Sequence, residues 1–486
     1  MEEKAIRGVP WTFMSFAGSK LVSVGTTLVL ARLLVPADFG VMALAIMATS
    51  FLYWIGDLGF AGTLIHRQDL DRRSQGTVFT LMMGSSLLAT LLALGLAPVA
   101  GDVFHSSRLT PVLAVMSGVL LIGGLSGFYD AVCQRELEFR KRFAGYATQS
   151  LVNAAVAIPL AVSGAGVWSL VAGQVASYGG MAIVLMTLSP YRVRPRLERE
   201  ALRDIFSSSR GFVVQGITQF IRQNIDTVVV GRRFGTSSLG FYSMSIKLGD
   251  LSYWALAGPV ITVTFPAFSR SRQRGEDIRP AFLSVLRLLA LVGCPFGILL
   301  SGAADPLVRT VFGERWLPMV GPLTVLGLWA AIRPIDATLS WLLNSVGRAG
   351  AAAWVSVGVI APLIPAFILA THLGRLSAVA VVVLGDTFFS LFVLSALVRR
   401  YVDLPMRQTW QALRPVMAAA PLMWGATWGA SHAVGSGRPL LALVAAVAAG
   451  LATYLAVIAL VDRSLLGRAL AQILRTVGRT PAPIPS

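Results

Sequence analysis

The chain has 486 residues, of which 55% are hydrophobic and 13% are charged, and its mean hydropathy is +0.71. A soluble core does not need so much apolar surface, so this composition excludes a large soluble domain and indicates an integral membrane protein. The formal net charge of +18 comes from basic residues dispersed over many short loops. Because they do not gather on one face, we expect no nucleic-acid partner.

Apolar stretches long enough to cross a hydrocarbon core of roughly 30 Å recur along the whole chain. The first begins after Arg7 and is too long, without a small-residue cleavage site, for a removed signal peptide, so we expect a retained helix. The sequence predicts an all-α membrane protein with about 14 transmembrane helices. These are expected near residues 9–33, 38–64, 75–97, 110–131, 143–163, 166–188, 209–234, 239–266, 281–302, 316–341, 352–371, 376–397, 415–434 and 439–461.

The Lys and Arg residues of the loops fall mostly on one side of this arrangement, the side that also holds both termini. Cytoplasmic loops carry an excess of cations. We therefore expect a multi-pass protein of the bacterial inner membrane with both termini in the cytoplasm. Two cysteines, Cys133 and Cys294, give neither a metal-ligand spacing nor a disulfide framework. No metal site and no cofactor are expected.

An internal repeat divides the chain. A shift of 200 residues places ARLLVPADFG (31–40) over GRRFGTSSLG (231–240), and Arg32 then matches Arg232 while Gly40 matches Gly240. The shift pairs spans with spans of the same orientation, which predicts two six-helix lobes related by a parallel pseudo-two-fold axis, with a site between them. We therefore expect an N-terminal lobe at 1–200, a C-terminal lobe at 201–400, and two further helices with a cytoplasmic tail at 401–486.

Charged and polar side chains inside spans carry the most functional information, because a charge at mid-membrane costs at least about 2.5–3.5 kcal/mol and rarely faces lipid. Several recur at helical spacing and form polar stripes. The intramembrane cations that we expect in a cavity are Lys20, Arg222, Lys247 and Arg333; the acids expected to balance charge or couple to an ion are Asp57, Asp226, Asp250 and Asp336; and the neutral polar lining is Gln215, Gln219, Gln223, Ser340 and Asn344.

Each of these charges also has a structural interpretation. Arg222 with Asp226, Lys247 with Asp250, or Arg333 with Asp336 lie three or four residues apart and would neutralise each other along one helix. In a water-filled cleft, the same cations would attract an anionic headgroup, since Lys and Arg both bind phosphate well. Nearby aromatic residues, Tyr242 and Tyr253 among them, would stack on sugar faces or simply pack in the core.

Four segments resemble the Wzx-type polysaccharide transporters of the multidrug/oligosaccharidyl-lipid/polysaccharide exporter superfamily. They are ARLLVPADFGVMALA (31–45), DLGFAGTLIHRQDL (57–70), NIDTVVVGRRFGTSSLGFYSMSIKL (224–248) and PVITVTFPAFSRSR (259–272). The resemblance implies a flippase that moves undecaprenyl-diphosphate-linked oligosaccharide repeat units of O-antigen, capsule or exopolysaccharide from the cytoplasmic to the periplasmic leaflet by alternating access. It also implies membrane lipids, a coupling H⁺ or Na⁺, and polysaccharide polymerase and chain-length proteins as partners.

Three alternatives remain open on the sequence. A cation-coupled drug or metabolite antiporter of the same superfamily would have an acid-dominated cavity and usually about 12 helices. A lipid II flippase would have arginines in its first lobe, whereas Lys20 is the intramembrane cation there. A glycosyltransferase, polymerase or ligase would be an enzyme, but no nucleophile–base arrangement or phosphate-binding glycine loop stands out. We therefore expect a transporter and not an enzyme.

Overall fold

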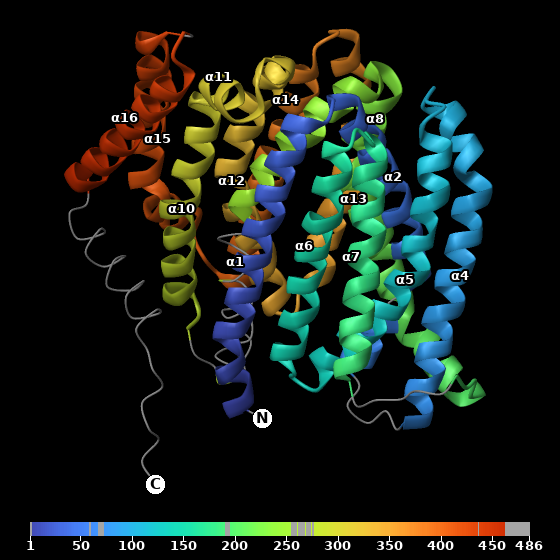
Figure 1. Ribbon diagram of the computed structural model, residues 1–486. Helices are drawn as coiled ribbons and strands as arrows, with labels where there is room; N and C mark the ends of the chain where they lie inside the picture. Colours follow the sequence, from blue (N-terminus) through green and yellow to red (C-terminus); the bar gives the residue numbers. More distant parts are fainter. Residues whose placement is uncertain are drawn as a thin grey trace. The chain divides into compact units, whose positions relative to one another are not determined.

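The computed structural model describes residues 2–57, 60–66, 72–189, 195–253, 260, 268, 274, 277–435 and 437–461. Within these ranges, only the backbone is described at 2–17, 55–57, 63, 66, 72–74, 199–217, 219, 349, 351–357 and 359. The described residues are mainly helical (Figure 1). The chain divides into two compact units, the first Met1–Met244 with Ser356–Val379 and the second Ser245–Val355 with Ala380–Ser486.

The described part of the first unit is built from helices, most of them more than 20 residues long. They are α1 (Glu2–Leu33), α2 (Pro36–Asp57), α3 (Phe60–His66), α4 (Arg72–Val103), α5 (Leu109–Arg135), α6 (Phe139–Val162), α7 (Val167–Leu188), most of α8 (Arg199–Ser252) and part of α13 (Ala349–His372). Helix α8 is broken at Gly235, whose φ of 79° and ψ of 177° are not helical. The break separates a first segment, 199–234, from a second segment, 236–252.

The second unit contains the end of α8 and the remaining helices. These are α10 (Arg279–Gly302), α11 (Ala304–Leu307), η2 (Val308–Phe312), η3 (Glu314–Met319), α12 (Val320–Ser345), α14 (Leu376–Val402), α15 (Met406–Val434) and α16 (Pro439–Val461). Helices α15 and α16 pack against each other, as do α10 and α12 (Figure 1). The core of this unit is built from α10, α12, α14, α15 and α16.

The all-helical membrane fold predicted from the sequence is confirmed. Each predicted span falls on a helix wherever the structure describes it, and the spans 209–234 and 239–266 meet at the break in α8. Nine helices among the described residues are long and apolar enough to cross a membrane. Several helices extend beyond the predicted spans, since hydropathy locates the apolar core while the helix continues into the polar interface; α15 begins at Met406 rather than near residue 415.

A partly buried ion pair joins α5 to α6 in the first unit. Arg142 donates from Nε to Asp130 Oδ1 at 2.8 Å and from a second guanidinium nitrogen to Oδ2 at 3.0 Å. The side chains are 22% and 16% exposed, and the Tyr146 hydroxyl donates to the same carboxylate at 3.3 Å. This two-pronged geometry is the arrangement in which Arg holds a carboxylate most strongly, so Asp130 has a structural role.

Prolines inside the helices of the second unit leave backbone carbonyls that a neighbouring helix satisfies. Proline has no N–H, so Pro295 in α10 leaves the carbonyl of Leu291 without its helical donor. The buried Tyr454 of α16 donates its hydroxyl to that carbonyl at 2.9 Å. In a bilayer an unsatisfied carbonyl cannot turn to water, so this bond makes the proline tolerable and fixes α16 against α10.

We expect Tyr454→Phe to lower the free energy of unfolding by about 1–2 kcal/mol, because the carbonyl of Leu291 then stays buried without a donor. The control is Pro295→Ala, which restores an N–H donor to the same carbonyl. In the Pro295→Ala background the cost of Tyr454→Phe should therefore fall to a few tenths of a kcal/mol. Thermal unfolding of the four purified proteins in detergent measures this coupling; equal costs in both backgrounds would contradict it.

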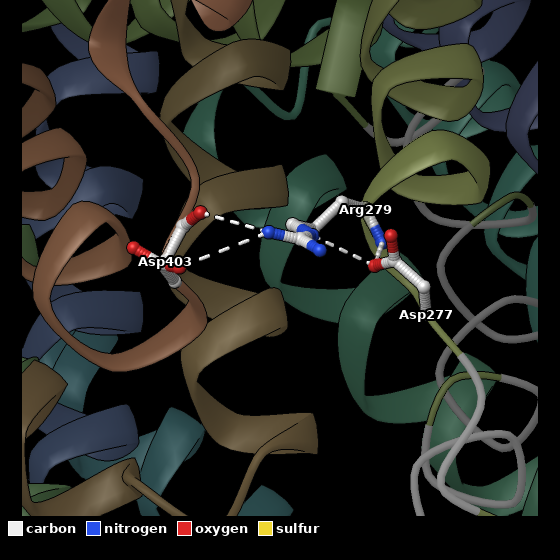
Figure 2. Close-up of polar contacts among 3 residues, drawn as sticks. All are labelled: Asp277, Arg279 and Asp403. Atoms are coloured by element: carbon white, nitrogen blue, oxygen red, sulfur yellow. Dashed lines mark hydrogen bonds and ion pairs between the residues drawn. The ribbon is translucent and has the colours of Figure 1, made fainter.

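The start of α10 is tied to the loop between α14 and α15. Figure 2 shows Arg279 between Asp277 and Asp403. Asp277 accepts hydrogen bonds from Arg279 Nε at 2.8 Å and from the Arg279 backbone N–H at 3.0 Å, while another guanidinium nitrogen reaches the Asp403 carbonyl at 3.3 Å. The side-chain bond from Arg279, followed by the backbone bond, lowers the pKa of the Asp277 carboxyl. This exposed group orients the entry to α10 and adds little stability.

Candidate functional site

An ion pair between two helices is the centre of the candidate site in the second unit. Arg333 of α12 pairs with Asp250 of the second segment of α8, and the two side chains are 24% and 27% exposed. Both residues lie in predicted membrane spans. A charged pair at this depth is costly unless it is matched or faces a polar space, which makes it a functional candidate by default.

Two aromatic rings enclose the Arg333 guanidinium. Its central carbon lies 4.4 Å from the centroid of the Trp329 ring, one turn earlier on α12, and 5.1 Å from that of Tyr253, the residue directly after α8. Both distances are within the range of cation–π attraction. The position of the guanidinium is therefore fixed by Asp250 and by the two rings together.

The sequence around Pro334 explains how α8 is held against α12. Pro334 cannot donate to the carbonyl of Ala330, and the buried Ser252 hydroxyl lies 2.9 Å from that oxygen. Ser252 comes between Asp250 and Tyr253 in the chain. The contact thus places both partners of Arg333 at the correct height on α12.

The other predicted residues of the second unit differ in exposure. Lys247 is exposed, one turn before Asp250 on α8, and no ion pair within the described residues includes it. Asp336, Ser340 and Asn344 are half-buried and continue along α12 beyond Arg333. Their positions three, seven and eleven residues after Arg333 place them on the same side of the helix. The polar side chains that were predicted to form a stripe along α12 are therefore partly exposed.

The structural pairing expected along single helices is not the one that forms around Asp250. The sequence offered Lys247 as its partner three residues away, whereas Asp250 pairs with Arg333 on another helix. Arg333 provides a planar, multi-donor group at a site enclosed by aromatic rings, which suits guanidinium better than ammonium. Lys247 is left exposed on the same segment.

In the first unit, Asp226 is buried, at 6% exposed, and its hydrogen bonds bridge the break in α8. It accepts from the Tyr242 hydroxyl at 2.9 Å and from the Thr227 backbone N–H at 2.7 Å. Tyr242 therefore binds a carboxylate and is fully buried, which agrees with packing in the core, the second of the two interpretations that the sequence left open for it. The role of Asp226 in ion coupling stays a prediction.

The remaining predicted site residues of the first unit are less completely described. Lys20 on α1 and Gln223 on α8 are exposed, and Arg222 is half-buried. The side chains of Asp57, Gln215 and Gln219 lie outside the described residues. The expected cavity between lobes, and the contribution of each residue to it, remain predictions.

A small cavity lies in the first unit between α2, α4 and α5. Its lining is apolar apart from Tyr53, Ser85 and Ser86, and it contains no charged side chain. A site without a cation does not favour an anionic ligand. This cavity is therefore a weaker candidate than the surroundings of Arg333.

Sequence reasoning missed Trp329 and Ser252. Trp329 lies four residues before Arg333, so the helical period already places the two on one face of α12. The signal for Ser252 was weaker. Pro334 predicts that the carbonyl of Ala330 needs a donor from elsewhere, but the identity of that donor depends on which helix packs there.

Comparison with known proteins adds a family match and two relatives, and it also finds a similar solved structure. The sequence profile of the family described as "Polysaccharide biosynthesis protein" matches residues 29–321. The succinoglycan biosynthesis transport protein ExoT of Rhizobium meliloti (strain 1021) is 26% identical over 353 residues, which are 72% of this chain and 70% of that protein. The lipopolysaccharide biosynthesis protein WzxC of Escherichia coli (strain K12) is 24% identical over 413 residues, 81% of each chain.

Among solved structures, the lipid II flippase MurJ in an inward closed conformation is similar with a TM-score of 0.77. The match covers 94% of this chain and 99% of that one at 13% sequence identity. At this identity the likeness concerns the fold, and the same fold serves unrelated cargoes.

Proposed function

This chain belongs to the polysaccharide biosynthesis protein family, and from that premise we propose that it flips a lipid-linked oligosaccharide across the membrane. It is a multi-pass membrane protein of a transport family rather than an enzyme, and its relatives serve polysaccharide biosynthesis. The cargo is an undecaprenyl-diphosphate-linked repeat unit of O-antigen, capsule or exopolysaccharide. It moves from the cytoplasmic to the periplasmic leaflet by alternating access of two six-helix lobes, 1–200 and 201–400.

The observation that carries this proposal is the Arg333 site. Arg333 lies inside a membrane-spanning helix, and the exposed Lys247 lies one turn from Asp250, the acidic partner of Arg333. These two cations concentrate positive charge within the membrane, which a neutral or cationic cargo would not need. A diphosphate provides the matching negative charge and the acceptor oxygens that a guanidinium recognises. Asp250 then balances Arg333 when no cargo is bound.

The other intramembrane charges are assigned by the same reasoning. Lys20, Arg222 and Lys247 would meet the diphosphate or the acidic groups of the glycan, since mobile cations in a polar cleft attract anions. Asp57, Asp226 and Asp336 would balance charge or bind the coupling ion, H⁺ or Na⁺. Gln215, Gln219, Gln223, Ser340 and Asn344 would line the path with neutral hydrogen-bonding groups.

Both termini are proposed to lie in the cytoplasm of a bacterial cell, on the side that carries most of the loop cations. Polysaccharide polymerase and chain-length proteins would then receive the cargo at the opposite face of the inner membrane. Anionic lipid headgroups would contact the same cytoplasmic arginines.

Depletion of the protein tests the proposal. In depleted cells, the undecaprenyl-diphosphate-linked repeat unit should accumulate at the cytoplasmic leaflet and become inaccessible to a periplasmic glycan-modifying enzyme. Re-expression of the full chain should restore accessibility. The control strain carries the same depletion but lacks the first glycosyltransferase of the repeat unit, and so makes no cargo.

Two outcomes would contradict this assignment. If the repeat unit keeps its leaflet distribution in a depleted strain without a redundant flippase, the protein does not flip repeat units. Cytoplasmic accumulation of lipid II, with the repeat unit distributed normally, would reassign the cargo to the peptidoglycan precursor.

A further inference from the structure

Two arginines of the second unit converge on one aromatic ring. The central guanidinium carbon of Arg348, just after α12, lies 4.8 Å from the centroid of the Tyr401 ring. That of Arg400, in the last turn of α14, lies 5.9 Å from the same centroid. Both distances are within the range of cation–π attraction. These three residues, which we call the arginine cluster, bring two positive charges to the ends of two helices.

The fold fixes the backbone of the arginine cluster. At the end of α12 the Gly347 N–H donates to the Asn344 carbonyl at 3.1 Å, and the next N–H, that of Arg348, donates to the Leu343 carbonyl at 2.9 Å. Gly347 has a φ of 75°, the left-handed conformation that this helix ending requires. Tyr401 is half-buried and packs against the hydrophobic core of the second unit. The ring and the Arg348 backbone are therefore held in place.

The charges of the arginine cluster are not neutralised within the part of the chain that the structure describes. Both arginines are exposed, and no ion pair among the described residues includes either of them. The acids of the neighbouring loops contact another cation: Asp277 lies 2.8 Å from Arg279 and Asp403 lies 3.9 Å from it. Two like charges on one ring, without a carboxylate, attract an anion from outside the protein.

The chemistry of the guanidinium selects the kind of anion. Cation–π attraction to a ring does not use the N–H donors of a guanidinium, which lie in its plane. Each arginine of the cluster therefore keeps the donors that form parallel, charge-assisted hydrogen bonds with phosphate oxygens. A phosphate ester is the biological anion that matches two such groups.

The surroundings of the arginine cluster indicate a lipid as the source of the phosphate. α12 and α14 both belong to helices long and apolar enough to cross a membrane, and the two arginines lie at their ends. On α14, Phe389, Phe392 and Ala396 precede Arg400 at helical spacing, and all are exposed. An exposed apolar stripe that leads to a pair of cations has the polarity of a phospholipid, whereas a free phosphate would use only the cations.

We propose that Arg348 and Arg400, held at the ring of Tyr401, bind the phosphate headgroup of an anionic phospholipid whose acyl chains lie along the exposed face of α14. This site goes beyond the proposed transport function, which concerns a lipid-linked glycan. With both termini in the cytoplasm, the bound lipid belongs to the cytoplasmic leaflet. It joins the ends of α12 and α14 at the membrane surface.

Binding of dioleoylphosphatidylglycerol to the purified full-length protein tests the proposal, with dioleoylphosphatidylcholine as the neutral comparison. Native mass spectrometry in an uncharged detergent measures the lipid bound per protein, and no charged membrane surface contributes there. We expect the Kd for phosphatidylglycerol to rise about tenfold in Arg348→Ala and in Arg400→Ala, since each variant loses a charge-assisted contact to phosphate. Equal affinity of the parent protein for the two lipids would overturn the proposal.

Arg399→Ala is the matched control. Arg399 precedes Arg400 on α14 and is also exposed, so its removal changes the net charge by the same amount, but no contact with the Tyr401 ring is described for it. The Kd of this variant should stay within about twofold of the parent value, because its charge lies outside the cluster. Equal weakening by all three alanine variants would indicate general attraction between charges and would overturn the site.

Arg348→Lys combined with Arg400→Lys decides the matter should the alanine variants not fold, because it keeps every charge. Lysine has no planar group to contact the ring and no parallel donors, so phosphatidylglycerol should again bind about tenfold more weakly. Parent affinity in this double variant would overturn the role of the two guanidinium groups.

Competition with inorganic phosphate distinguishes a lipid headgroup from a free anion. An excess of inorganic phosphate should leave phosphatidylglycerol bound, because the acyl chains on α14 add apolar contacts that the free ion lacks. Displacement of the lipid would assign the arginine cluster to a soluble phosphate and overturn the lipid site. None of these measurements needs cargo, so their outcome is independent of the flippase assignment.

Discussion

Arg333→Ala is expected to reduce export of lipid-linked oligosaccharide at least about tenfold while leaving membrane insertion unchanged. A charge-assisted hydrogen bond contributes about 1.5–3 kcal/mol, and 1.4 kcal/mol corresponds to a factor of ten. The variant loses the guanidinium that we assign to the diphosphate, and Asp250 then stays in the membrane without its cation. Appearance of the repeat unit at the periplasmic leaflet, normalised to protein level, measures the effect.

Arg333→Lys separates charge from geometry at the same position. A lysine keeps the charge but cannot form the planar, two-pronged contact or stack between Trp329 and Tyr253 as a guanidinium does. Recovery of export by this variant would indicate simple attraction of an anion. Failure of recovery in a stable protein would indicate that the shape of the guanidinium matters.

Exchanging the two charges distinguishes substrate binding from a structural ion pair. Arg333→Asp combined with Asp250→Arg preserves an ion pair between α12 and α8 but moves the cation to the other helix. If the pair only holds the helices together, the exchanged protein should export at a level near that of the parent. If Arg333 contacts the cargo, stability should recover and export should not. Normal export by stable Arg333→Ala protein would remove the anion-binding assignment altogether.

Arg142→Ala is expected to lower the free energy of unfolding by about 3 kcal/mol. Removing one partner of a largely buried ion pair leaves the other charge desolvated and unpaired. Asp130 would keep only the Tyr146 hydroxyl among the partners described for it in the first unit. Thermal unfolding of the purified protein in detergent measures the change, and export by the residual folded protein should be close to normal.

Lys141→Ala is the matched control, since Lys141 is the neighbouring residue and its pair with Glu138 spans one helical turn. That pair should contribute only about 0.5 kcal/mol. The double variant Asp130→Ala with Arg142→Ala should be more stable than Arg142→Ala alone, because no unpaired carboxylate remains. If Arg142→Ala and Lys141→Ala are equally stable, the ion pair between α5 and α6 contributes no more to the free energy of unfolding than an exposed pair does.

The helices of this protein were predictable because the bilayer imposes one rule on every span. A backbone in hydrocarbon must satisfy its own hydrogen bonds, so each apolar stretch of sufficient length becomes a helix. The predicted spans coincide with the helices wherever these are described, including the pair that meets at the break at Gly235. The ends were less well placed, as α15 shows, because an interfacial residue is compatible with either helix or loop.

The candidate site was only partly predictable. Arg333 and Asp250 stood out because a charge within an apolar stretch is rare, and this signal is local to each helix. Their pairing was not visible, since the sequence neighbours of Asp250 included a closer cation, Lys247. The hydrogen bond of Asp226 was not visible either: the sequence offered Arg222 as a neighbour one turn away, whereas the structure shows the Tyr242 hydroxyl donating to Asp226 across the break in α8.

The sequence alone thus determined the membrane class, the positions of the spans, the repeat register and which spans contain charges, because hydropathy and helical period are properties of short stretches. The tertiary structure decided which charges meet, that Tyr454 and Ser252 reach the carbonyls left by Pro295 and Pro334, and that Arg348 and Arg400 share the ring of Tyr401. Those contacts depend on which helices are neighbours and at what height they pack. Many helices of similar hydropathy can pack in many ways, and only the fitting of particular side chains and glycines selects one of them.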